Sequence, residues 1–153
     1  MMNFFRKYLY SWMRLVWLLV KPMSLGVRLL MVRDGKVLLV RHVYQDQWFL
    51  PGGLVEPGET LAAAARREAL EEVGASLHDL TLFGVYSHRE LGKINHVVVF
   101  LSRQFELNGR SDSEIEQYAF FDRKALPADV SAASRWQIER LDTPDPQATY
   151  KDW

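Results

Sequence analysis

Cysteine is absent from the 153 residues of the chain. This excludes disulfides, thiolate nucleophiles and thiolate zinc sites, so a bound metal would need oxygen or imidazole ligands. It fits a reducing compartment, and we expect a cytoplasmic location. Net charge is also lacking, because 19 Lys and Arg residues balance 19 Asp and Glu residues. No global field draws the chain onto nucleic acid, and we predict no specific nucleic-acid partner.

A long apolar run is missing as well. Residues 4–20 are rich in aromatic and basic side chains, but their longest uninterrupted apolar stretch is Leu15–Val20. A spanning helix needs about 20 consecutive apolar residues, so we expect residues 1–22 to form a helix that does not cross a membrane. Its apolar side chains could pack on the domain or on a second subunit of a homodimer, which we favour. Alternatively, Trp12 and Trp17 could anchor it peripherally on a lipid surface.

The rest of the composition is typical of one globular domain. Apolar residues make up 48% of the chain and charged residues 25%, which is close to the average for folded proteins. We expect a domain over residues 23–142. A polar, proline-interrupted tail over residues 143–153 should be mobile.

Strand and helix patterns alternate within this domain. Thr60 is a plausible helix N-cap, Gly74 closes the same helix, and residues 89–95 read as a loop. Strands are expected over residues 27–32, 37–43, 48–50, 80–87, 96–105 and 118–121, and helices over 61–73 and 131–141. Runs of strands with two separated helices indicate an α+β fold or a mixed sheet between helices.

The helix over residues 61–73 gathers three carboxylates on one face. At 100° per residue, Glu72 lies about 40° to one side of Glu68, and Glu71 lies about 60° to the other. Like charges at this spacing destabilise an isolated helix, and a nearby divalent cation would reverse that cost. Carboxylate oxygens suit a hard cation, Mg²⁺ or Mn²⁺. The neighbouring Arg67 can pair with one carboxylate and fix its direction.

Taken alone, such a helix end is best interpreted as a solvated acidic surface. The preceding loop changes this interpretation. Gly52 and Gly53 allow the backbone to come close to a phosphate or a metal, and Glu59 adds a fourth carboxylate just before the helix. The segment therefore combines the groups that a metal-assisted reaction on phosphate requires.

Together these residues resemble the Nudix box, G-x5-E-x7-R-E-U-x-E-E-x-G-U, where U is an apolar residue. Every fixed position is present between Gly53 and Ala75, and the two variable apolar positions hold small alanines. The matching residues are Gly53, Glu59, Arg67, Glu68, Ala69, Glu71, Glu72, Gly74 and Ala75.

The resemblance implies an α/β/α sandwich with a mixed sheet. It also implies hydrolysis of a nucleoside diphosphate linked to a further moiety. By the same resemblance, Glu68, Glu71 and Glu72 bind Mg²⁺ or Mn²⁺, and one of them, often at the Glu68 position, acts as the base. Arg67 falls on the position that orients a catalytic glutamate by ion pairing.

Further site residues follow from the resemblance with less support. Gly53 and Glu59 fall on positions that shape the loop and add to the metal site, and we place Glu59 on the substrate side. Glu114 lies where some Nudix enzymes supply another metal-binding glutamate from a separate loop.

Basic residues outside the box are candidates for contact with the substrate. Arg41 and His42 end a predicted strand, where they either meet phosphate or ribose or form a surface pair, and the surface pair is slightly favoured. His88 and Arg89 flank a loop, where they either meet a distal phosphate or are solvated. We include Arg41, His88 and Arg89 among the substrate-binding candidates.

We therefore predict a metal-dependent pyrophosphohydrolase that acts on a small nucleotide-type substrate. Metal ions would lower the pKa of bound water and clamp the phosphates, while a carboxylate acts as general base. The alternative is a non-catalytic Nudix-fold module that binds a nucleotide or a partner protein. The intact acidic helix argues against this alternative, because a binding module need not keep it.

Overall fold

A computed structural model describes residues 23–90, 93–109, 113–142 and 149–152. The helix expected over residues 1–22, with its proposed dimer or membrane contact, lies outside these ranges. Within them, no helix has the length and apolar character needed to cross a bilayer.

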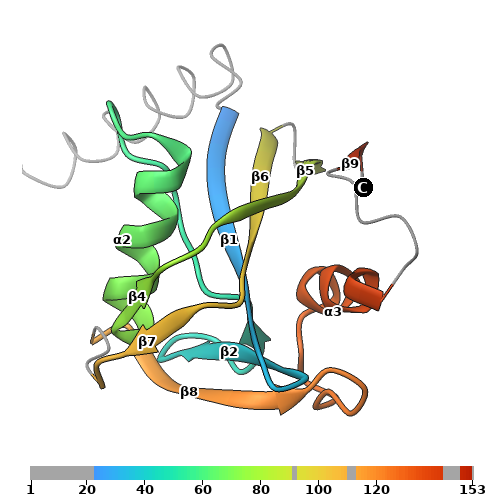
Figure 1. Cartoon of the computed structure of the whole chain (residues 1–153). Coiled ribbons are helices and arrows are strands. Elements are labelled where there is room, and N and C mark those ends of the chain that lie inside the picture. Colours follow the sequence, from blue (N-terminus) through green and yellow to red (C-terminus); the bar gives the residue numbers. More distant parts are fainter. Residues whose placement is uncertain (1–22, 91–92, 110–112, 143–148, 153) are drawn as a thin grey trace, which may run out of the picture.

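A mixed sheet lies between two helices (Figure 1). The helices are α2 (Leu61–Val73) and α3 (Ala132–Glu139), the second followed by a 3-10 turn, Arg140–Asp142. The strands are β1 (Met23–Arg33), β2 (Lys36–His42), β3 (Trp48–Phe49), β4 (Ala75–Leu77), β5 (Thr81–Glu90), β6 (Lys93–Ser102), β7 (Phe105–Leu107), β8 (Ile115–Asp122) and β9 (Thr149–Asp152). This arrangement confirms the predicted α/β/α sandwich.

Strand β1 joins the two halves of the sheet. The order is β3-β2-β1-β6-β5-β9, with β8 also paired to β2, while β4 and β7 form a separate two-stranded sheet. Most of β1 runs parallel to β6, and only its end pairs with β2, through Val32 and Val37. The other edge of β1 is therefore free to pair with the loop that follows β3. Val27 N–H donates to the Gly53 carbonyl at 2.9 Å, and Leu29 N–H donates to the Pro51 carbonyl at 2.8 Å.

The core has one apolar layer on each side of the sheet. Side chains alternate along β1, so Val27 and Leu29 face α2 and Leu30 faces α3. Small residues on α2, among them Ala65 and Ala69, are fully buried and let the helix lie close to β1. This close packing holds the carboxylate-bearing part of α2 next to the loop after β3.

The structure corrects three predictions about local elements. Residues 89–90 and 93–95 lie in strands rather than in a loop, because β5 and β6 stay paired as far as Glu90 and Lys93, with Arg89 opposite Ile94. Within the tail, which we expected to be mobile, residues 149–152 form β9, and this strand runs parallel to β5. The single strand expected over residues 96–105 ends at Ser102, and β7 begins at Phe105. The extent of these strands depends on pairing with strands that are distant in sequence. Short polar segments show no hydrophobic periodicity from which such pairing could be predicted.

Candidate active site

Helix α2 is capped at both ends by residues adjacent to it in the sequence. The Thr60 hydroxyl accepts a hydrogen bond from the Ala63 N–H at 3.1 Å, which caps the first turn. Gly74, at a φ of 62°, ends the helix in the left-handed conformation. The helix therefore runs over the predicted residues, and the acidic side chains fall in its last two turns.

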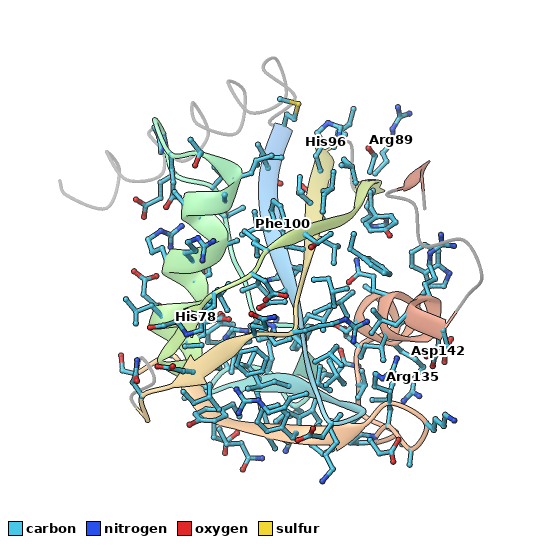
Figure 2. The ribbon with its side chains drawn as sticks, in the orientation of Figure 1. His78, Arg89, His96, Phe100, Arg135 and Asp142 are labelled. Atoms are coloured by element: carbon cyan, nitrogen blue, oxygen red, sulfur yellow. The ribbon has the colours of Figure 1, made fainter. Side chains whose placement is uncertain are left out.

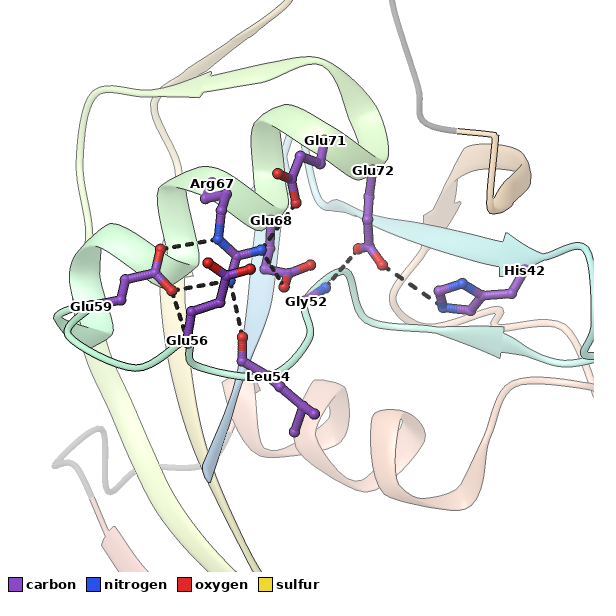
Figure 3. Close-up of polar contacts among 9 residues, drawn as sticks. All are labelled: His42, Gly52, Leu54, Glu56, Glu59, Arg67, Glu68, Glu71 and Glu72. Carbon is purple, nitrogen blue, oxygen red and sulfur yellow. Dashed lines mark hydrogen bonds and ion pairs between the residues drawn. The ribbon is translucent and has the colours of Figure 1, made fainter. Parts of the chain in front are cut away.

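Arg67 is the centre of a hydrogen-bond network (Figure 3). Its Nε donates to Oε1 of Glu59, and its Nη2 donates to Oε2 of the same carboxylate, both at 3.0 Å. Nη1 donates to Glu68 at 2.8 Å and to Glu71 at 3.0 Å, and Nη2 also donates to the Leu54 carbonyl at 2.9 Å. These bonds lower the pKa of Glu59 and raise that of Arg67. Arg67 thus ties α2 to the preceding loop and leaves one Glu68 oxygen without a bond from it.

Glu72 does not contact Arg67 and is held instead by groups of the loop after β3 and of β2. The Gly52 N–H donates to its Oε2 at 2.7 Å, and His42 Nε2 lies 3.8 Å from its Oε1. Burial raises the pKa of Glu72 to about 7, although the Gly52 bond and Arg28 oppose the shift. Burial also raises the pKa of Glu68 and lowers that of His42. Two desolvated carboxylates therefore lie one helical turn apart, beside a histidine that favours its neutral form.

Gly52 and Gly53 are required by close contacts. A Cβ at Gly52 would overlap the Val27 carbonyl and lie 3.0 Å from Cα of Arg28, and the φ of 131° also disfavours any side chain there. A Cβ at Gly53 would lie 2.8 Å from Cδ of Glu68. The two glycines thus bring the backbone against β1 and leave space for the Glu68 carboxylate.

Gly53→Ala tests this fit. The added methyl group meets the flexible end of Glu68, so the carboxylate should move while the fold survives. A displacement of about 1 Å at a reacting group can cost about 100-fold in rate, and we expect a loss of that order. Turnover and thermal unfolding of the full chain should be measured together. Unchanged turnover would show that the Glu68 position is not critical.

The acidic groups line a cleft of about 680 Å³, here called the acidic cleft. Glu56, Glu68, Glu72 and Glu114 contribute carboxylates to its wall. Glu71 is not part of this wall, and its side chain is 47% exposed. The remaining lining residues are Arg28, His42, Tyr44, Gln45, Phe49, Gly52, Gly53, Leu54, Val55, Pro57 and Arg67.

The acidic cleft fits a cation that takes few protein ligands. Among the described residues, no three acidic, histidine or cysteine side chains already converge as a metal cage. Mg²⁺ characteristically binds one or two carboxylates and completes its shell with water and substrate phosphates. Glu72 and Glu114 could supply such a pair, because Glu114 is close enough to raise the pKa of Glu72, and Glu68 lines the same cleft one helical turn away. The donor set therefore matches a hard cation that shares its shell with a substrate.

A second cavity of about 440 Å³, here called the apolar pocket, lies on the α3 side of the sheet. Arg28 and Phe49 line both this pocket and the acidic cleft. The other lining residues are His88, Asn95, Val97, Ser131, Ala132, Ala133, Ser134 and Gln137. The size falls in the range of small-molecule sites.

The basic candidates are distributed unevenly. His88 lines the apolar pocket. Arg41 bonds to Asp129 and lies 4.7 Å from the Trp48 ring centroid, so it is engaged in packing. Arg89 lies far from α2, near the end of β5, and lines neither cavity (Figure 2).

Arg28 was not predicted as a site residue, and His42 was considered with Arg41 but not retained as a substrate-binding candidate, yet both Arg28 and His42 line the acidic cleft. The sequence carries a signal for Arg28, because it is the one charged residue within the buried apolar run 27–32. A charge inside a buried strand is uncommon without a partner or a function.

The buried Glu72 should make stability depend on pH. Its pKa rises from the ordinary 4.5 to about 7 on folding. Between these values the folded chain retains a proton that the unfolded chain has lost. The free energy of unfolding should therefore fall as pH rises through this window, by at most about 3 kcal/mol. Denaturant unfolding without divalent cations should show this slope, and Glu72→Gln should reduce it by the contribution of Glu72. An identical slope in that variant would contradict the assignment.

The fold and the cleft define an α/β/α sandwich protein with an acidic site bordered by glycines. The NUDIX domain model matches residues 22–141, and the chain belongs to the Nudix family.

Several relatives and solved structures resemble the chain. The human 8-oxo-dGDP phosphatase NUDT18 is 34% identical over 106 residues, which are 65% of this chain and 32% of that protein. The ADP-ribose pyrophosphatase of Methanocaldococcus jannaschii is 33% identical over 100 residues, which are 62% of this chain and 59% of that protein. The chain thus spans less than two thirds of either relative. The crystal structure of a MutT NUDIX hydrolase from Burkholderia pseudomallei has 29% identity and a TM-score of 0.72, covering 78% of this chain and 98% of that one.

Proposed function

We propose that the chain is a metal-dependent hydrolase that cleaves a phosphoanhydride bond in a nucleoside diphosphate linked to another moiety. The observation that carries the proposal is the pair of desolvated carboxylates, Glu68 and Glu72, facing one cleft beside the Arg67 network. Burying two like charges is costly, and a cation bound beside them together with an anionic substrate would offset that cost.

In this proposal, Glu72 and Glu114 hold the divalent cation, and Glu71 can join them when it leaves Arg67. A bound cation lowers the pKa of coordinated water and neutralises charge on the phosphates. Glu68 accepts the proton of the attacking water through the oxygen that Arg67 does not bond. Burial raises the pKa of Glu68, which makes it a stronger base than an exposed carboxylate.

Arg67 acts as a positioning residue. Its bonds to Glu59 and to the Leu54 carbonyl fix the guanidinium, which then fixes the direction of Glu68. Glu59 therefore contributes through Arg67, although we predicted that it lies on the substrate side of the site.

Small nucleotide substrates are supported by the names of the relatives. These include an 8-oxo-dGDP phosphatase and an ADP-ribose pyrophosphatase. The apolar pocket has room for a moiety of nucleoside size next to the acidic cleft. A non-catalytic binding module is disfavoured, because it would bury Glu68 and Glu72 without using them.

A substrate panel tests the proposal. The full chain, with Mg²⁺ or Mn²⁺, should be incubated with ADP-ribose, nucleoside triphosphates, 8-oxo-dGDP, nucleotide sugars, dinucleoside polyphosphates and 5′-triphosphorylated RNA. We expect a nucleoside monophosphate or phosphate product from at least one small nucleotide, and only with a divalent cation. Absence of any product from the whole panel would favour the binding-module alternative.

A further inference from the structure

Arg28 is a mostly buried cation for which the proposed mechanism has no role. It lies on β1 opposite Val99 of β6. Its neighbours Val27 and Leu29 face α2, so the alternation of the strand directs Arg28 to the other side, together with Leu30. A guanidinium in this place is costly unless its donors find acceptors.

The Arg28 guanidinium forms no hydrogen bond or ion pair within the part of the chain that the structure describes. Glu72 and Glu68 are near enough to favour its charged form, but neither forms an ion pair with it. The five N–H donors of its guanidinium are therefore not committed to a carboxylate, and its side chain lines cavities in which a ligand could accept from them.

The position of Arg28 indicates what kind of ligand this is. Arg28 lines the acidic cleft, the apolar pocket and a third cavity of about 260 Å³ along β1 and β6. A molecule that reaches from Glu68 and Glu72 into the apolar pocket must pass Arg28. The group at that junction connects the reacting phosphate to the moiety in the pocket.

We propose that Arg28 determines substrate specificity by binding the phosphate that lies between the acidic cleft and the apolar pocket. The inference rests on the proposed function and extends it to a named contact. The planar guanidinium can bond two oxygens of one phosphate, which an ammonium cannot match. With the charges of Glu68 and Glu72 offset by a cation, Arg28 provides positive charge for an anionic ligand. The chain should therefore require a substrate that carries phosphate at this junction.

Calorimetric titration with inorganic pyrophosphate, in the presence of Mg²⁺, measures this contact separately from the turnover of a nucleotide substrate. The full chain should be compared with Arg28→Met and Arg28→Lys. We expect affinity to fall about 10- to 100-fold in Arg28→Met and about tenfold in Arg28→Lys, as for the loss of charge-assisted hydrogen bonds. Arg103→Met is the matched control, because Arg103 is exposed and lines neither the cleft nor the pocket. Arg28→Lys keeps the test valid if Arg28→Met does not fold.

Mn²⁺ binding distinguishes phosphate binding by Arg28 from a role in which Arg28 only balances the negative charges of Glu68 and Glu72. Removing a cation near Glu68 and Glu72 should leave Mn²⁺ affinity unchanged or tighter, while pyrophosphate affinity falls. Unchanged pyrophosphate affinity in the folded variants would overturn the inference, and so would a parallel loss of Mn²⁺ binding. If pyrophosphate binding depends on Arg28 but no substrate of the panel is cleaved, only the proposed function fails.

Discussion

Glu72→Gln should lower turnover of the full chain by at least about 100-fold, the scale of losing a metal ligand or its close partner. Glutamine keeps the size of the side chain and can still accept the Gly52 N–H bond. It cannot supply the negative charge that would hold a divalent cation. Thermal unfolding should be unchanged or occur at higher temperature at neutral pH, because the desolvated charge is gone.

Glu106→Gln provides the control for this substitution. Glu106 lies on β7, its side chain is 74% exposed, and it does not line the acidic cleft. The same chemical change there should leave turnover within about twofold of the unmodified chain, since exposed substitutions usually have small effects. Equal turnover in Glu72→Gln and Glu106→Gln would remove Glu72 from the mechanism.

Arg67→Lys should reduce kcat by about 10- to 100-fold, with a smaller effect on KM. Lysine keeps the charge but cannot bond both Glu59 oxygens while also reaching Glu68. The Arg67 bond lowers the pKa of Glu68, so weakening it should move the acidic limb of the kcat profile to higher pH. A merely structural role would lower stability without moving that limb.

Arg66→Lys is the matched control on the same helix. Arg66 donates to the Leu77 carbonyl and does not line the acidic cleft. Lysine can also donate to a single carbonyl, so activity and its pH profile should be retained. Equal losses in the two variants would indicate general damage to α2 rather than a specific role for Arg67.

The sequence predicts α2 and its carboxylate face well, because helix spacing is local information. The structure divides that face more finely. Burial of Ala65 and Ala69 fixes the rotation of the helix. As a result Glu72, on one side of Glu68, enters the cleft, while Glu71, on the other side, turns to Arg67 and solvent. Around the helix axis, Glu72 and Glu71 lie about 40° and 60° from Glu68 on either side. These angles alone do not tell which of the two faces the cleft, because that depends on where the sheet lies.

Other parts of the site depend on pairing between distant segments. Arg28 reaches the cleft because the loop after β3 pairs with the free edge of β1 through Gly53 and Pro51. His88 faces the apolar pocket because β5 and β6 continue pairing through residues that are polar in sequence. The spacing of residues along the chain predicts neither the position of Arg28 nor that of His88. Only Arg28 has a signal in the sequence, because it is the single charged residue within the apolar run 27–32.

Electron paramagnetic resonance of Mn²⁺ titrated into the full chain tests the central claim most directly, because it reports cation binding independently of the substrate. We predict bound Mn²⁺ in the unmodified chain and in Glu106→Gln, and affinity at least about tenfold weaker in Glu72→Gln. Equal Mn²⁺ affinity in all three proteins would contradict the account, because the acidic cleft would then not be the cation site.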